Sequence, residues 1–130
     1  CLRAVASAIR TACDSDDVAC RFGGEEFLIL RSDHSPRPRC ALALAENIRH
    51  KVASLAIPHQ PTQEGKVTVS VGVCAGPFDP ETELERLIKA ADVALYEAKR
   101  EGRNRVRYGS HATGSAVPAL PTYSIDADNA

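Results

Sequence analysis

The sequence predicts a single α/β (α+β) sandwich, in which helices flank a mostly antiparallel central sheet. Three observations predict it. Segments with helical and strand-like spacing of apolar residues follow one another as helix, hairpin, helix, strand, helix, strand. The 130 residues are 44% hydrophobic and 25% charged, which is typical of one soluble domain with one core. No apolar run approaches the ~20 residues needed to span a bilayer.

The first half of the chain is expected to form a helix and then a β-hairpin. Apolar residues recur at helical spacing over residues 2–13. The polar run 14–17 ends this helix, because short polar side chains compete for backbone hydrogen bonds. Strand-like runs near 18–22 and 27–31 are joined through a Gly-Gly pair. Glycine reaches the positive φ angles that tight turns need, so these runs predict a hairpin.

The second half is expected to add two helices and two strands. A proline-containing loop leads to a helix whose apolar face runs from Ala41 to Leu55. Valines then alternate with polar or small residues over 67–73, which is the clearest strand pattern in the chain. A third helix begins near residues 79–82 and ends at Gly102, a residue type that commonly stops helices. Arg105–Tyr108 predicts a final edge strand.

We expect the domain to occupy residues 1–108 and to be followed by a flexible tail. Gly, Ser, Ala, Pro and Thr dominate residues 109–130 without a period. The chain begins with Cys1 and contains no methionine, so we expect it to be a piece of a longer protein.

Charge and cysteine content exclude several classes of function. The formal net charge of −1 argues against bulk electrostatic binding to nucleic acid or to an acidic membrane. The five cysteines are scattered singly, and the four histidines do not complete a zinc spacing. We therefore expect reduced thiols in a cytosolic protein.

The turn of the predicted hairpin carries an unusual pair of charges. Glu25 and Glu26 are adjacent carboxylates where the chain reverses. The preceding Gly23 and Gly24 have no side chains, so a phosphate can approach the backbone closely. Carboxylate oxygens beside substrate phosphates are typical ligands of Mg²⁺. These residues predict a Mg²⁺ site at the hairpin tip, and a surface hairpin with two solvated glutamates is the alternative.

A pair of cations near the end of the third helix is the second signal. Lys99 and Arg103 are four residues apart, so we expect them to project from one face. Such a pair suits a triphosphate, since Arg offers a planar fork and Lys a point charge. The alternative is a solvated helix end with salt bridges.

Two stretches of the chain carry a family resemblance. They are Arg-Phe-Gly-Gly-Glu-Glu-Phe at 21–27 and Ala-Asp-x-Ala-Leu-Tyr-x-Ala-Lys-x-x-Gly-Arg-Asn at 91–104. Together they closely resemble the two signatures of the GGDEF family, the bacterial diguanylate cyclases. Residues 68–73 are similar to the central strand of that family. The resemblance implies a palm-like fold related to nucleotidyl cyclases. It also implies an enzyme that condenses two GTP into cyclic di-GMP and releases two pyrophosphates.

The resemblance implies a role for each motif residue. Glu25 would bind the divalent cation, Mg²⁺ or Mn²⁺, and Glu26 would be required for turnover. The two glycines before them would let the nucleotide lie against the hairpin. Lys99 and Arg103 would grip the triphosphate.

Partners and location also follow from the resemblance. Two subunits that each hold one GTP would face each other, so catalysis implies a homodimer. The product, cyclic di-GMP, is expected to bind at the active site if it inhibits. The protein is expected in the bacterial cytoplasm, where upstream domains could anchor it to a membrane.

The sequence departs from the family at an inhibitory site. Many members carry an RxxD motif that binds product just ahead of the hairpin. Here Asp17 matches the motif's Asp, but Asp14 stands at the position of the Arg. A second carboxylate would repel a dianionic dinucleotide and cannot stack on its guanines. We therefore expect no feedback through this site.

The family domain also begins earlier than this chain does. The resemblance implies a preceding strand with a further metal-binding Asp, and a helix that reads the guanine. Neither precedes Cys1, so the chain is expected to hold the C-terminal two thirds of the domain. We expect this segment alone to be inactive and marginally stable, and the enzymatic assignment to concern the parent protein.

Two other hypotheses remain open from the sequence. One is a GGDEF domain that binds GTP or cyclic di-GMP without turnover and signals through a partner. The other is a structural or dimerisation domain in which the hairpin glutamates are solvated.

Overall fold

The structure, a computed structural model, describes residues 2–15, 17–21, 26–30, 38–58, 65–74, 84–109 and 122–127. In chain order, the elements within these ranges are α1 (Leu2–Ala12), β1 (Val18–Arg21), β2 (Glu26–Leu30), α2 (Pro38–Ser54), β3 (Val69–Cys74), α3 (Leu84–Arg100), β4 (Val106–Gly109) and β5 (Thr122–Ala127).

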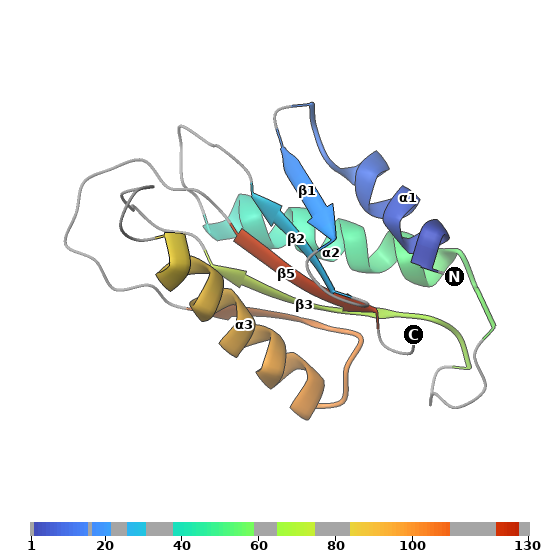
Figure 1. Ribbon diagram of the computed structural model, residues 1–130. Helices are drawn as coiled ribbons and strands as arrows, with labels where there is room; N and C mark the ends of the chain where they lie inside the picture. The colour runs from blue at the N-terminus through green and yellow to red at the C-terminus, as the bar shows by residue number, and fades with distance from the viewer. Residues whose placement is uncertain are drawn as a thin grey trace.

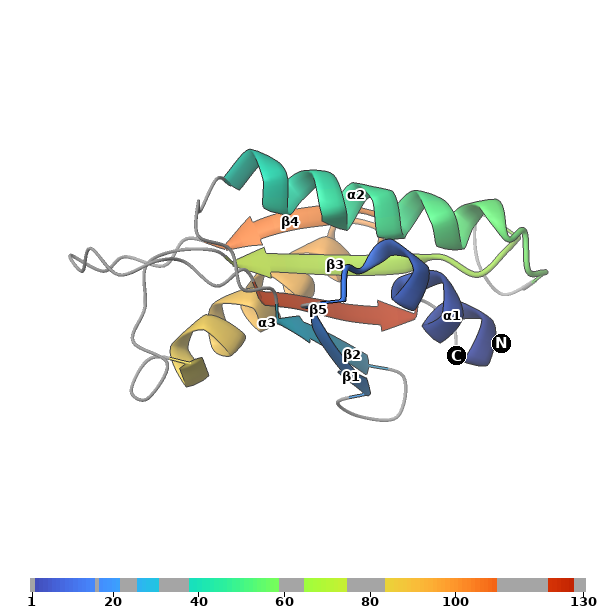
Figure 2. The same cartoon turned by 90° about the horizontal axis from the view of Figure 1, so that it is seen from above.

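These elements form a sheet with helices on both faces, so the predicted α/β sandwich is confirmed. Helices α1 and α2 cover one face of the sheet and α3 covers the other (Figures 1 and 2). The three predicted helices are present. Among the described helices, none combines the length and the apolar character needed to cross a bilayer.

The described strands form one five-stranded sheet in the order β1-β2-β5-β3-β4. Strands β1 and β2 pair antiparallel, with Arg21 opposite Phe27, which confirms the predicted hairpin. Its tip, residues 22–25, lies outside the described residues. Strand β5 pairs antiparallel with both β2 and β3, whereas β3 and β4 are parallel. The strand predicted over 67–73 is β3, and the predicted edge strand is β4.

Strand β5 is the main difference from the sequence-based expectation. Residues 109–130 were predicted to be a flexible tail, and this is wrong for residues 122–127, which lie in the middle of the sheet. In the described part of the chain, β5 is the strand that joins the β1–β2 pair to the β3–β4 pair (Figure 2). Its pairing partners come from residues about a hundred and about fifty positions earlier, so local composition did not reveal it.

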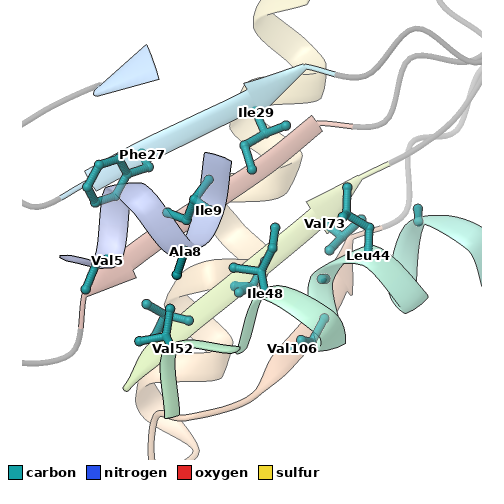
Figure 3. Close-up of a cluster of buried hydrophobic side chains, with 14 of the residues drawn as sticks. Val5, Ala8, Ile9, Phe27, Ile29, Leu44, Ile48, Val52, Val73 and Val106 are labelled. Atoms are coloured by element: carbon teal, nitrogen blue, oxygen red, sulfur yellow. The ribbon is translucent and has the colours of Figure 1, made fainter. Parts of the chain in front are cut away.

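The larger part of the core lies between the sheet and helices α1 and α2 (Figure 3). Its side chains come from alternate residues of the strands and from the apolar faces that the two helices turn toward the sheet. The largest fully buried ones in this cluster are Val5, Ile9, Ile29, Ile48, Val52, Val67, Val69, Val71 and Val73.

Helix α3 packs on the opposite face through small residues. A side chain at Gly72 of β3 would overlap the backbone of Ala91 and Leu95 in α3. Cys74, two residues further along β3, packs against Leu87 and Ala91. Because α3 lies this close to the strand, its position along β3 is fixed, and with it the position of its C-terminal end.

Candidate functional site

The turn that follows α3 has a tightly fixed backbone. The Arg103 amide donates to the Ala98 carbonyl at 2.9 Å, and the Gly102 amide donates to the Lys99 carbonyl at 3.3 Å. This pair of bonds is a Schellman motif, which caps the end of a helix. Gly102 has φ +124°, in the region that favours glycine, so the predicted helix stop is confirmed. We call residues 101–105 the capping turn.

Two further residues of the capping turn have positive φ angles without being glycine. Arg103 has φ 64° and Asn104 has φ 47°. Asn tolerates this region, but Arg rarely adopts it, so the surroundings must hold it. The Arg105 Nε donates to the Arg103 carbonyl at 3.0 Å. From helix α2, the Arg49 Nη1 donates to the Asn104 Oδ1 at 3.1 Å.

The capping turn thus accounts for where Lys99 and Arg103 lie. Lys99 is half-buried in the last turn of α3, and Arg103 is exposed beyond the end of the helix. The helical i, i+4 spacing used to predict a shared face therefore does not apply. The Schellman bonds and the left-handed backbone set the relation between the two residues instead.

Other arginines around the turn are paired with glutamates. Arg107 and Arg105 both contact Glu101, and Arg100 lies 3.4 Å from Glu97. The hydrogen bond from Arg107 lowers the pKa of the Glu101 carboxyl below its ordinary value. These exposed pairs stabilise the surface only weakly.

The hairpin side of the site is described from Glu26 onward. Glu26 is the first residue of β2 and is half-buried. Phe27 belongs to the core under α1 and α2, so Glu26, its neighbour, lies on the α3 face of the sheet. Gly23, Gly24 and Glu25 lie outside the described residues.

A single register line crosses the sheet from Glu26. Glu26 is opposite Asp126 of β5, and Asp126 is opposite Ser70 of β3. Directly opposite residues share a face of an antiparallel pair. Ser70 is fully buried, two residues before Gly72, on the α3 face.

This register line and the capping turn lie at the same end of the molecule. On the side of β3 that α3 covers, Cys74 packs against Leu87 and Gly72 lies against Leu95. The next position on this side, Ser70, is therefore nearest the C-terminal end of α3. In addition, the Val71 amide donates to the Arg105 carbonyl at 3.0 Å, which joins the turn to β3 beside Ser70. In Figure 1, the C-terminal end of α3 and the start of β2 both lie toward the right-hand end of the sheet.

The predicted metal site lies largely outside the described residues. Among the described side chains, no group of three His, Cys, Asp or Glu residues comes together. Glu25, the predicted metal ligand, lies outside this part of the chain. Glu26 offers the kind of oxygen donor that Mg²⁺ prefers, so the donor chemistry fits.

The segment that matches the family's inhibitory motif forms a small turn. The Asp14 amide donates to the Asp17 Oδ2 at 2.8 Å, and the Asp17 amide donates to the Asp14 carbonyl at 3.1 Å. These bonds link α1 to β1.

Sequence reasoning missed the bracing of the capping turn and the strand β5, which pairs beside Glu26. Arg49 and Asn104 are 55 residues apart, and no local pattern links them. The positive φ of Asn104 could have been predicted from the sequence, because Asn tolerates left-handed backbone and here follows the Gly-Arg pair after the helix. Asp126 could have been found only by recognising β5.

Comparison with known proteins gives the family. Residues 1–105 match the family described as "Diguanylate cyclase, GGDEF domain". The chain is 40% identical over 108 residues to diguanylate cyclase A of Treponema denticola, covering 81% of this chain and 27% of that protein. It is 38% identical over 105 residues to diguanylate cyclase DosC of Escherichia coli K12, covering 81% of this chain and 22% of that protein.

A solved structure is also similar. It is the crystal structure of the GGDEF domain of DgcB from Caulobacter crescentus in complex with c-di-GMP, with a TM-score of 0.66 and 34% identity. The match covers 82% of this chain and 61% of that chain. The chain spans about a quarter of the length of the curated relatives named above. On sequence and fold alike, the chain belongs to the GGDEF family of diguanylate cyclase domains.

Proposed function

We propose that this domain is the catalytic domain of a diguanylate cyclase, which condenses two GTP into cyclic di-GMP and releases two pyrophosphates. One observation carries the proposal beyond family membership. The start of β2, at the second glutamate of the Gly-Gly-Glu-Glu motif, lies at the same end of the sheet as the end of α3, which carries Lys99, and the capping turn, which carries Arg103. A nucleotide bound there would contact both motifs.

Lys99 and Arg103 would bind the triphosphate. Arg103 presents a planar fork that suits phosphate oxygens, and Lys99 adds a compact positive charge. Arg103 is exposed, on a turn whose backbone is closed by hydrogen bonds at both of its ends. Because the backbone of Arg103 is already fixed, binding phosphate would cost only the freedom of its side chain, which favours affinity.

Glu25 and Glu26 would supply the carboxylates of the reaction. We assign Glu25 as the ligand of Mg²⁺, or of Mn²⁺, and Glu26 as the group needed for turnover. When bound, the metal ion supplies charge neutralisation at the phosphates during phosphoryl transfer. Gly23 and Gly24 would leave room for the nucleotide against the hairpin.

Catalysis would need two copies of the domain. Each site holds one GTP, and the 3′-hydroxyl of each ribose has to attack the α-phosphate of the other nucleotide. A homodimer with the two sites facing each other meets this requirement. The rate should therefore rise more steeply than linearly with protein concentration across the dimerisation range.

Product inhibition, where it occurs, would act at the active site. The carboxylate of Asp17 already accepts the Asp14 amide, and Asp14 replaces the arginine that would face the product. Both features argue against an inhibitory site at this turn.

The proposed substrate, GTP, and the buried thiol of Cys74 both support a cytoplasmic location. The cytoplasm is the compartment that supplies GTP. Burial raises the pKa of the Cys74 thiol to about 11, so it stays protonated and unreactive at neutral pH. A free, buried thiol of this kind is typical of a reducing compartment.

The test is an assay of the full-length protein with GTP and Mg²⁺, in which pyrophosphate and cyclic di-GMP are measured together. We expect one cyclic di-GMP for every two pyrophosphates. GTP binding without pyrophosphate release would instead indicate a receptor, and absence of Mg²⁺-dependent GTP binding would indicate a structural module.

A further inference from the structure

The bond between Arg49 and Asn104 connects the capping turn to a helix from another part of the chain. We propose that Arg49 is a positioning residue, which holds Arg103 in its phosphate-binding position by way of Asn104. This role rests on the proposed function of Arg103. It assigns to Arg49 a role in substrate affinity without contact with the nucleotide.

The turn is held both by its own bonds and by a bond from outside it. The Schellman bonds fix the amides of Gly102 and Arg103, and Arg105 fixes the Arg103 carbonyl. Asn104 comes next and also has a positive φ, which is unfavourable for any residue with a side chain. A change in the backbone of Asn104 would rotate the peptide that it shares with Arg103, and would move the Arg103 side chain.

Arg49 is suited to hold Asn104 because its helix is anchored in the core. Its neighbour in α2, Ile48, and Val52 one turn later are fully buried. The Arg49 Nη1 donates to Asn104, and its Nε donates to Glu46 at 2.9 Å. The guanidinium is thus paired with Glu46 of its own helix while it donates to Asn104. Through its bond to Asn104, the well-packed helix α2 restrains the capping turn.

The charge of Arg49 does not by itself explain a role in binding. Arg100 carries the same charge closer to Lys99 in sequence, on the exposed side of α3, and pairs with Glu97. Removing Arg100 therefore tests the loss of one positive charge near the site. Removing Arg49 tests the same loss of charge together with the loss of the bond to Asn104.

The experiment measures the affinity of the full-length protein for GTP and for GMP by calorimetry in the presence of Mg²⁺. We expect Arg49→Ala to weaken GTP binding about fivefold to tenfold and to leave GMP binding unchanged, since only the triphosphate contacts Arg103. Arg100→Ala and Glu46→Gln, which leave the Arg49–Asn104 bond in place, should change GTP affinity less than twofold. Asn104→Asp keeps an acceptor for Arg49 and should retain GTP affinity.

A double variant separates positioning from a direct contact. In an Arg103→Ala background, Arg49→Ala should have no further effect on GTP affinity, because the residue it positions is gone. Additive losses would overturn the proposal, since Arg49 would then act on the nucleotide independently. An unchanged GTP affinity in Arg49→Ala would also overturn it. If Arg49→Ala does not fold, the same comparisons are made with Arg49→Lys, which keeps the charge but not the fork.

Failure of the proposed function would give a different result. If Arg103→Ala alone leaves GTP affinity unchanged, the assignment of Arg103 to the triphosphate is wrong. If Arg103→Ala weakens binding and Arg49→Ala does not, only the positioning role of Arg49 is wrong.

Discussion

The capping turn after α3 and the start of β2 lie at the same end of the sheet, but they are held in different ways. Hydrogen bonds join the capping turn to α3, to β3, to α2 and to itself. In the described part of the hairpin, β1 pairs with β2, and β2 pairs with β5. Strand β1 is at the edge, all four of its residues are exposed, and Val18 is 59% exposed.

This difference suggests a division of labour between the two motifs. A turn with a fixed backbone presents cations in one position, which favours affinity for a charged ligand. Glu26 lies at the start of β2, where pairing with β5 fixes the backbone from Glu26 onward. Changes in the hairpin should therefore affect turnover more than binding, and changes in the turn should affect binding first.

The largest effect is expected from Glu26→Gln. This change removes the carboxylate and keeps the size of the side chain, so the strand should still form. We expect turnover to fall by about 100-fold or more, as for loss of a group that takes part in the reaction, while GTP affinity stays within about threefold. Pyrophosphate release and calorimetry measure the two quantities. An equal loss of affinity and turnover would contradict the division of labour.

The next largest effect is expected from Ile125→Pro in β5. Proline lacks the amide that a central strand donates, and Ile125 lies opposite Phe27 on one side and Val71 on the other. We expect a loss of about 3 kcal/mol in the free energy of unfolding, measured by urea denaturation. Ile125→Val keeps the amide and should cost less than about 1.5 kcal/mol.

This substitution also tests whether residues 122–127 form a central strand of the sheet. If residues 122–127 take no part in the sheet, proline at position 125 should leave stability unchanged. A stable Ile125→Pro variant would therefore support the flexible tail that composition predicts.

Local patterns in the sequence predicted the three helices and the strands β1 to β4. They missed β5, because this strand is defined by pairing with distant parts of the chain. The alternating valines of β3 and the stop at Gly102 are properties of a few neighbouring residues, and both were found. The place of β5 depends on two strands that are distant in sequence. Composition of the surrounding segment gave no sign of that pairing.

The site shows the same limit. The motif residues were predicted from their spacing, but the helical geometry assumed for Lys99 and Arg103 does not extend to Arg103. They were expected on one helix face, whereas α3 ends at Arg100 and Arg103 has left-handed backbone. The bond from Arg49 that braces this backbone spans two helices, and a single sequence holds no signal for it.

A moderate effect is expected from Gly102→Ala in the capping turn. An added side chain would meet the Arg105 Nη2 at 2.8 Å, and φ +124° is strained for alanine. We expect a cost of about 1–3 kcal/mol in stability and a GTP affinity about tenfold weaker, because the Schellman bonds fix Arg103.

Gly65→Ala is the matched control for this change. Gly65 also has a positive φ, but an added side chain there meets nothing within 4 Å. Stability should fall by about 1 kcal/mol and GTP affinity should not change. A similar loss of GTP affinity in both variants would mean that general destabilisation, and not the turn, sets binding.

The smallest effect is expected at the turn between α1 and β1. Asp17→Ala removes the acceptor of the Asp14 amide and should cost about 1 kcal/mol in stability, whereas Asp17→Asn keeps an acceptor oxygen and should cost less. Neither should change the affinity for cyclic di-GMP measured by calorimetry, because the carboxylate is occupied within the turn and the facing residue is a second Asp. If cyclic di-GMP binding survives Arg103→Ala but disappears in Asp17→Ala, this turn is a product site after all. Feedback would then act on the hairpin through β1, the edge strand that starts at the next residue.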